Sequence, residues 1–227
     1  MKQKIYPCLK IIFELFQKLF LLIIPSLCAY CKVFLSERKI LCDECEYKIF
    51  PIVSKQIDVT ASFSITVFAL SDYKDPLKKL ILAKRWSEML ASFQLAQLIW
   101  QKTPISSLDY DIITPIPLHW TRYAQRGFNQ AHEIAKGLQK KRKVAVVHAL
   151  KRTRKTAFQS DLTSCARIAN MQKAFTLSVK NKELYKDKHI LLVDDLMTTG
   201  ATIREAAKEL LKLKPRKITV IVACRVI

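Results

Sequence analysis

The chain has 227 residues, half of them apolar, which is enough for one good-sized domain or one domain with a small appendage. Lysine and arginine total 39 against 19 acidic residues, and the formal net charge of +20 favours anionic partners: nucleic acid, a membrane surface or a polyphosphate. Seven cysteines, including two CxxC pairs close together, indicate a metal site in a reducing compartment and argue against a disulfide framework. There is no internal repeat and no low-complexity tract.

Residues 5–24 predict an amphipathic helix that ends at Pro25. Glu14 and Lys18 interrupt its apolar stretch, and the uncharged run from Leu19 is too short to span a bilayer. We therefore expect a buried or interfacial helix in a cytoplasmic protein. Attachment to the inner face of the membrane remains open, given the basic composition.

Two CxxC pairs follow this helix, separated by ten residues: Cys28, Cys31, Cys42 and Cys45. Each CxxC turn can direct both sulfurs at one ion, so four thiolates could hold Zn²⁺ tetrahedrally. Such a site leaves no coordination position open, and the metal is expected to be structural. Four unliganded core cysteines are the alternative.

Residues 46–60 are interpreted as a linker, so that an N-terminal helix and zinc module (1–60) precede a second domain (61–227). In that domain we expect a strand over 63–70 and a long helix from Asp75 to about residue 101, since a proline follows Asp75 at the first helical turn.

The strand expected over 110–114 runs into a proline-rich loop at 115–118. Arg126 and Asn129 lie farther along the same connection, and a helix is expected from there to about Lys140. Because this loop supplies a cation and an amide, it could grip a diphosphate or another acidic group.

A basic segment over 151–159 follows a strand expected at 144–149. Between Asp111 and Asp161 the only acidic residue is Glu133. The segment could be a mobile loop that closes over a polyanion, a nucleic-acid contact in which its single aromatic stacks on a base, or a solvated loop.

The most informative stretch begins with a buried strand over 190–193 that ends at Asp194 and Asp195. A turn of small residues (198–202) and a helix over 203–213 come next. Backbone N–H groups and hydroxyls at a helix N-terminus suit a phosphate. The two carboxylates repel phosphate but accept hydrogen bonds from sugar hydroxyls and can join a Mg²⁺ shell. Together they predict a sugar-phosphate site.

An ordinary strand–turn–helix, with Asp195 or Thr199 capping the helix, is the alternative. Gly200 favours the phosphate interpretation because its backbone can close around an anion without a Cβ in the way. A final strand is expected over 217–223. Strands alternating with helices predict an α/β fold whose mostly parallel sheet is flanked by helices and binds ligands at the strands' C-terminal ends.

Residues 191–202, LLVDDLMTTGAT, resemble the ribose-phosphate signature of type I phosphoribosyltransferases, and an ordered series of motifs resembles the ComF/GntX family of competence-associated proteins. The series runs from about residue 20 to the end of the chain. It comprises Cys28/Cys31/Cys42/Cys45, Tyr73–Lys78 with Lys84, Pro115–Leu118, Arg126–Gln130, Arg152–Gln159, Arg167–Asn170 and Phe175.

This resemblance implies a type I phosphoribosyltransferase-like fold that binds phosphoribosyl pyrophosphate with Mg²⁺. Asp194 and Asp195 would be the catalytic pair that holds the ribose hydroxyls, the turn at 198–202 would bind the 5′-phosphate, and residues 152–159 would form a flexible lid. The ligand-binding residues so implied are Thr198, Thr199, Gly200, Ala201, Thr202, Arg126, Asn129, Arg152, Arg154 and Gln159.

The function that follows is a phosphoribosyltransferase-like protein acting in DNA uptake during natural transformation. Displacement of pyrophosphate at the ribose needs no nucleophilic side chain, so turnover stays open. The alternatives are a non-catalytic competence factor that binds single-stranded DNA, and a nucleobase phosphoribosyltransferase of nucleotide salvage. Single-stranded DNA and other DNA-uptake proteins are the expected partners, and the sequence leaves the oligomeric state open.

Overall fold

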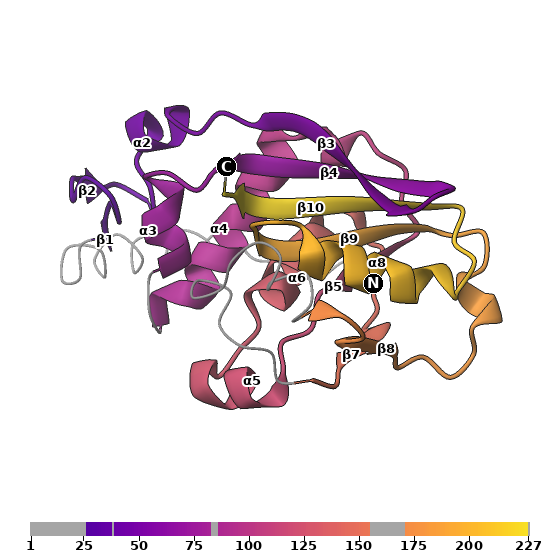
Figure 1. Cartoon of the computed structure of the whole chain (residues 1–227). Coiled ribbons are helices and arrows are strands. Elements are labelled where there is room, and N and C mark those ends of the chain that lie inside the picture. Colours follow the sequence, from indigo (N-terminus) through magenta and orange to yellow (C-terminus); the bar gives the residue numbers. More distant parts are fainter. Residues whose placement is uncertain (1–25, 38, 83–85, 155–170, 227) are drawn as a thin grey trace, which may run out of the picture. The chain divides into compact units, whose positions relative to one another are not determined.

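The chain forms two compact units, Met1–Lys48 and Ile49–Ile227, which are described separately (Figure 1). The residues described by this computed structural model are 26–37, 39–82, 86–154 and 171–226. The helix expected over residues 5–24 lies outside them.

The first unit contains a small antiparallel pair and a short helix. Strands β1 (Ser26–Leu27) and β2 (Phe34–Leu35) pair in antiparallel fashion, and helix α2 (Asp43–Tyr47) follows. Cys28 and Cys31 lie between the two strands in sequence, and Cys45 lies on α2, where it is buried. The two CxxC pairs thus belong to one hairpin and one helix.

The second unit is built on a six-stranded sheet with the order β3-β4-β10-β9-β5-β6. Its β3–β4 pair is antiparallel, and the other pairs are parallel. The strands are β3 (Ile52–Thr60), β4 (Phe63–Asp72), β5 (Ile112–Pro115), β6 (Ala145–Val146), β9 (His189–Met197) and β10 (Lys217–Arg225). The mostly parallel α/β sheet predicted from the sequence is confirmed.

Helices cover both faces of this sheet (Figure 1). Ile190 and Leu192 of β9 belong to the same buried cluster as Ile203 and Leu210, so one face packs against α8. The helices and short turns of this unit are α3 (Leu77–Leu82), α4 (Trp86–Lys102), η1 (Pro104–Ser106), α5 (Trp120–Arg126), α6 (Gln130–Arg142), η3 (Glu183–Tyr185) and α8 (Ala201–Leu211). In Figure 1, α4 and α6 lie on the side of the sheet away from α8. Central β9 is buried on both faces, as its continuous apolar run requires.

A separate two-stranded ribbon lies beside α8. Strands β7 (Leu150–Arg152) and β8 (Phe175–Leu177) pair in antiparallel fashion. Carboxylates of α8 hold it: Glu205 accepts a hydrogen bond from the backbone N–H of Lys173 at 3.2 Å, and Glu209 accepts one from Leu177 at 3.2 Å.

The prediction of a linker over residues 46–60 is wrong, because most of this segment forms the edge strand β3. Ile57 and Val59 are buried in the core, whereas Gln56, Asp58 and Thr60 are exposed, which is the alternation of a half-buried strand. The single long helix expected from Asp75 is described as two helices, α3 and α4, on either side of residues 83–85. The strand expected over 144–149 is limited to the two residues of β6.

Candidate functional site

The acidic pair lies near the C-terminal end of β9, as the sequence predicted. The strand does not stop at the carboxylates: pairing with β10 continues to Met197, which lies opposite Arg225. Asp194 is 8% exposed and Asp195 is half-buried. The backbone N–H of Asp195 donates to Oδ1 of Asp194 at 2.9 Å, which fixes the orientation of the buried carboxyl group.

Asp194 is electrostatically unusual. Burial, followed by the neighbouring carboxyl group of Asp195, raises its pKa well above the ordinary range, and the positive charge of Arg152 opposes this only in part. A buried carboxyl group with a raised pKa lacks sufficient positive charge around it. A ligand that brings hydroxyl donors or a cation to this point would supply what the site lacks.

The turn after the acidic pair contains a left-handed backbone conformation at its glycine. Gly200 has φ +78°, and a Cβ there would lie 2.9 Å from Cδ1 of Ile57 on β3. The Thr199 hydroxyl accepts from the backbone N–H of Ala201 at 3.4 Å. Thr198 and Thr202 are half-buried. Residues 198–202 therefore bring three threonine hydroxyls and the N-terminus of α8 into one short turn, a combination that suits a phosphate.

The proline-rich loop after β5 lies directly beside β9. The backbone N–H of Ile116 donates to the carbonyl oxygen of Val193 at 2.9 Å. Asn129 braces this loop: its side-chain NH₂ donates to the carbonyl of Ile116 at 2.9 Å, and its Oδ1 accepts from Ala131 N–H at 3.1 Å. The structure thus shows Asn129 shaping the loop and capping α6.

The segment between this loop and Asn129 is a short helix, α5, where the sequence suggested a continuous loop. His119 caps its start, since its Nδ1 accepts from Thr121 N–H at 3.4 Å. Gly127 ends it with φ +80° and donates its N–H to Tyr123. Arg126 is the last residue of α5, and its side chain is outside the described set.

Arg152 occupies a different place from the mobile lid predicted for it. It lies in β7, is 7% exposed, donates to the sulfur of Met171 at 3.5 Å and sits 5.6 Å from the ring centre of Phe175. Burial and the charge of Arg122 lower its pKa to about 10, while Asp194 opposes that shift. Arg152 is therefore a fixed cation near the acidic pair.

The rest of the predicted lid is only partly described. Arg154 is exposed, and its guanidinium donates to the carbonyl oxygen of Gln172 at 2.6 Å. Gln159 and the aromatic of the basic segment lie outside the described residues.

Three residues near the acidic pair were absent from the predicted site. Arg122 lies close enough to Arg152 to lower its pKa. Burial, then Cys224 and Asp195, raise the pKa of Tyr73, and burial, then Asp195, raise that of Cys224 to about 12. Tyr73 belongs to the motif series of the family resemblance, so a signal was present; for Cys224 it was not, because only the pairing of β10 brings it there.

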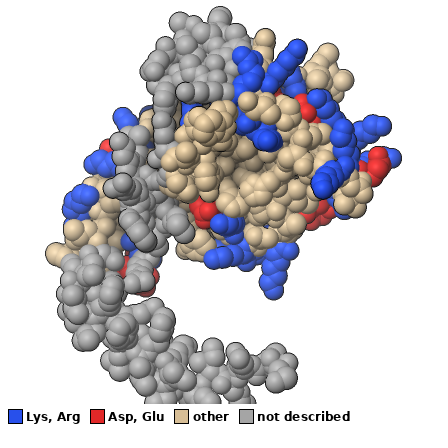
Figure 2. All heavy atoms as spheres, turned by 90° about the horizontal axis from the view of Figure 1, so that it is seen from below, with Lys and Arg blue, Asp and Glu red and all other residues tan. Residues whose placement is uncertain are grey.

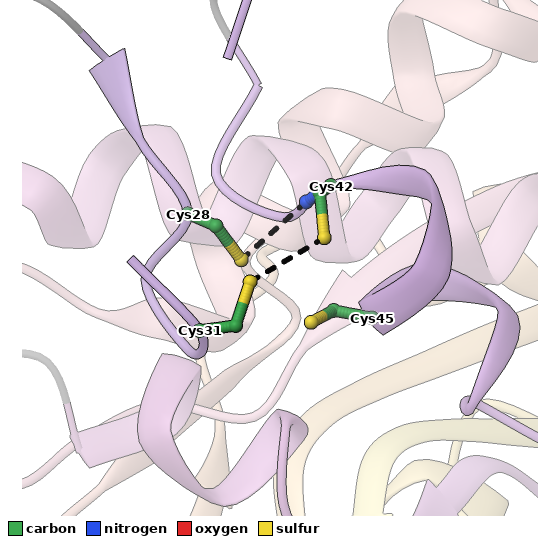
Figure 3. A group of neighbouring side chains, drawn as sticks. All are labelled: Cys28, Cys31, Cys42 and Cys45. Atoms are coloured by element: carbon green, nitrogen blue, oxygen red, sulfur yellow. Dashed lines mark hydrogen bonds between the residues drawn. The ribbon is translucent and has the colours of Figure 1, made fainter. Parts of the chain in front are cut away.

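The four cysteines of the first unit form one cluster (Figure 3). Their sulfurs all lie within 4.8 Å of one another, and Sγ of Cys31 is 3.6 Å from that of Cys42. Sulfurs at about 2.3 Å from a tetrahedral Zn²⁺ are separated by roughly 3.8 Å, so the cluster is nearly the right size for the ion. Burial raises the pKa of Cys28, but hydrogen bonds from backbone N–H groups outweigh it and bring the pKa to about 6, which favours the thiolate that binds metals. The cluster can hold a structural metal.

Comparison with known proteins identifies the class. A phosphoribosyl transferase domain family matches residues 124–227, the part that contains α6, β9, α8 and β10. Together with the sheet order, this defines a type I phosphoribosyltransferase-like domain preceded by a four-cysteine module.

Relatives narrow the class further. The chain is 31% identical over 166 residues to the DNA utilization protein YhgH of Salmonella typhi, covering 69% of this chain and 70% of the relative. It is 34% identical over 111 residues to competence protein F of Haemophilus influenzae, covering 48% of each protein, so the match spans about half the length of that relative. Competence protein ComFC of Bacillus subtilis is 33% identical over 103 residues. The chain belongs to the ComF family.

Some solved structures are weakly similar to the chain. They include glutamine phosphoribosylpyrophosphate amidotransferase of B. subtilis (TM-score 0.40, 15% identity, 58% of this chain and 25% of that one). Adenine phosphoribosyltransferase of Thermoanaerobacter pseudethanolicus is another (TM-score 0.38, 12% identity, 79% and 85%). Both TM-scores are low, so the fold assignment rests on the sheet topology and the family match.

Proposed function

We propose that this protein binds phosphoribosyl pyrophosphate with Mg²⁺ and acts in the uptake or use of DNA. One observation supports this ligand: three features lie next to one another on a single strand–turn–helix. They are the buried carboxyl group of Asp194, the half-buried Asp195, and the turn at Gly200 that precedes α8. A sugar phosphate carries hydroxyls and a phosphate on one small molecule, and such a pair of subsites can recognise both together.

In this proposal the two aspartates accept hydrogen bonds from the ribose hydroxyls, and residues 198–202 bind the 5′-phosphate through backbone N–H groups and hydroxyls. Arg152 adds a fixed positive charge on the Asp194 side. Carboxylate oxygens are donors that Mg²⁺ accepts, so Asp194 and Asp195 fit a role in its shell. Bound Mg²⁺ would supply positive charge that neutralises the diphosphate.

The DNA role is supported by the relatives, whose names are DNA utilization protein and competence protein. A formal charge of +20 suits a protein that meets a polyanion. Zn²⁺ in the four-cysteine cluster would be structural, since the four thiolates fill its coordination.

Isothermal titration calorimetry with phosphoribosyl pyrophosphate, with and without Mg²⁺, tests the ligand. We expect saturable binding that needs Mg²⁺ and that weakens about tenfold or more in Asp194→Asn and in Asp195→Asn, because each replaces an acceptor oxygen with an NH₂ donor. Asp187→Asn is a matched control: Asp187 has φ 57°, which asparagine adopts readily, and it lies at the opposite end of β9. No heat of binding with wild-type protein would overturn the ligand assignment.

A second function is retained because the basic surface and the relatives' names favour it: binding of single-stranded DNA without turnover. Pyrophosphate release distinguishes the two. Release on addition of a nucleobase would identify an enzyme of nucleotide salvage. Absence of release, with DNA uptake lost in a strain carrying Asp194→Asn and Asp195→Asn, would identify a binding protein.

A further inference from the structure

Helix α5 presents two large aromatic side chains to solvent. Trp120 is 72% exposed and Tyr123 is 53% exposed. Among the described large apolar side chains of the second unit, none is more exposed than Trp120. The two residues are three apart on a helix, so their side chains share one face. Exposing an indole ring to this degree has no stabilising role in the fold.

The short helix that carries these rings is capped at both ends. His119, which is only 5% exposed, caps α5 and has its Nδ1 2.9 Å from Oγ1 of Thr121. Its ring lies 5.8 Å from that of Trp120, tilted by 40°. At the other end, Gly127 closes the helix on the carbonyl of Tyr123. The backbone beneath the aromatic pair is thus fixed before a ligand binds, which lowers the conformational entropy that binding costs.

The loop that leads into α5 is joined to the strand that carries the acidic pair. Four residues before Trp120, Ile116 is hydrogen-bonded to Val193, the residue that precedes the acidic pair. Arg122 lies between the two aromatics in sequence and is close enough to Arg152 to affect its pKa. Helix α5 is therefore linked to the strand of the acidic pair through the loop that precedes it and through Arg122.

The surroundings are basic. Between Asp111 and Asp161 the chain has a single acidic residue, Glu133, and that residue is already paired with Lys136 at 3.0 Å. Figure 2 views the molecule from the side on which Figure 1 draws α5, and shows lysines and arginines around an uncharged surface, with few acidic side chains. An uncharged aromatic surface with a basic surround matches a ligand of flat rings linked by phosphates.

We propose that Trp120 and Tyr123 form a base-stacking platform for single-stranded nucleic acid. The proposal rests on the DNA role proposed above and adds to it the surface that makes the contact. Unpaired bases can stack on the two rings whatever their sequence, while the surrounding cations contact the phosphates. Duplex DNA has its bases stacked already and gains nothing from the platform.

Fluorescence anisotropy of a labelled oligothymidylate tests this with the full-length protein. Each stacked base contributes enough that Trp120→Ala/Tyr123→Ala should bind at least about tenfold more weakly. Trp120→Phe/Tyr123→Phe keeps two flat rings and should restore most of the affinity. Leu184→Ala is the matched control, because Leu184 is 66% exposed but lies in η3, before the start of β9.

Salt dependence separates stacking from charge. The slope of log affinity against log salt counts phosphate contacts, so the alanine pair should lower the affinity and leave the slope unchanged. Arg122→Ala should lower both. Affinity for a duplex of the same length should be equal in wild type and in the alanine pair.

Equal oligothymidylate affinity in wild type and the alanine pair would overturn the platform while leaving the DNA role intact. Loss of self-association in place of DNA affinity, seen by sedimentation, would identify a protein interface and also overturn it. If wild-type protein binds no oligothymidylate, both the proposed DNA role and the proposed platform are contradicted. Calorimetry with phosphoribosyl pyrophosphate on Trp120→Ala/Tyr123→Ala, expected to match wild type, keeps the sugar-phosphate site separate from both outcomes.

Discussion

Two glycines of the second unit share a left-handed backbone but have different surroundings. Gly200, before α8, has φ +78°, and Gly127, after α5, has φ +80°. A Cβ at Gly127 meets no atom within 4 Å, whereas one at Gly200 approaches Ile57 to 2.9 Å. The backbone cost of a side chain is therefore common to both positions, and the steric cost belongs to Gly200 alone.

Alanine at the two positions separates these costs. Gly127→Ala should lower the free energy of unfolding by about 1–2 kcal/mol, the cost of the left-handed conformation. Gly200→Ala should cost roughly 1–3 kcal/mol more, because Ile57 has to move as well. Urea unfolding measures both. Equal losses would contradict the close approach of β3 to the turn.

The raised pKa of Asp194 makes stability depend on pH. The folded state binds this proton more tightly than the unfolded chain, where an aspartate titrates near 3.8, so stability falls as pH rises above that value. Asp194→Asn imitates the protonated group. The stability of this variant relative to wild type should therefore increase from pH 4 to pH 7, by at most about 1.4 kcal/mol per pH unit. Urea unfolding curves at several pH values measure it, and parallel profiles for the two proteins would contradict a raised pKa.

At the scale of elements, local sequence patterns predicted the centre of the sheet well. The strands expected over 63–70, 110–114, 190–193 and 217–223 correspond to β4, β5, β9 and β10. These are the strands whose apolar runs are continuous enough to be recognised without knowledge of their neighbours.

The elements that were missed depend on distant partners. Edge strand β3 carries the weaker alternating pattern and pairs with β4 through a turn at Ala61 and Ser62 that contains no glycine or asparagine. Strand β9 extends past its two carboxylates because β10 continues beside it. Arg152 was expected in a lid because the sequence around it does not reveal its distant partners. In the structure, Arg152 is buried against Met171 and Phe175.

The residues of the candidate site also divide into those that local sequence predicts and those that depend on distant partners. Asp194, Asp195 and the turn at 198–202 were predicted because they are contiguous, and the structure places them at the end of β9 and the start of α8. Arg122 and Cys224 reach the same neighbourhood only through tertiary pairing. The predicted binding roles themselves remain proposals.

The attachment of the β7–β8 ribbon to α8 is a testable property of these elements. Glu209 accepts from the backbone N–H of Leu177, and this partly buried N–H loses its acceptor in Glu209→Ala, at a cost of about 1 kcal/mol. Amide hydrogen exchange should become faster at Leu177 and stay unchanged at Lys173, which Glu205 holds. Glu209→Gln keeps an acceptor oxygen and should protect Leu177. Unchanged exchange in the alanine variant would show that the ribbon is held by other contacts.

At the scale of the whole molecule, the two compact units predict two separable responses to metal removal. All four cysteines of the cluster lie in the first unit, so a strong chelator should remove one zinc ion per chain and destabilise that unit alone. Limited proteolysis should then cut within residues 26–48, while the sheet of the second unit remains resistant. Cutting throughout the chain would show that the metal supports both units.

Among the described residues, none of the helices is both long enough and apolar enough to cross a membrane.

The most direct test of the central claim is a ¹H–¹⁵N correlation spectrum recorded during titration with phosphoribosyl pyrophosphate and Mg²⁺. If the turn before α8 binds the 5′-phosphate, the amide signals of Thr199, Gly200 and Ala201 should shift most, together with those of Asp194 and Asp195. Ribose 5-phosphate should shift the same turn, because it shares the phosphate and the hydroxyls. Shifts confined to other parts of the chain, or no shifts at millimolar ligand, would contradict a sugar-phosphate site at the end of β9.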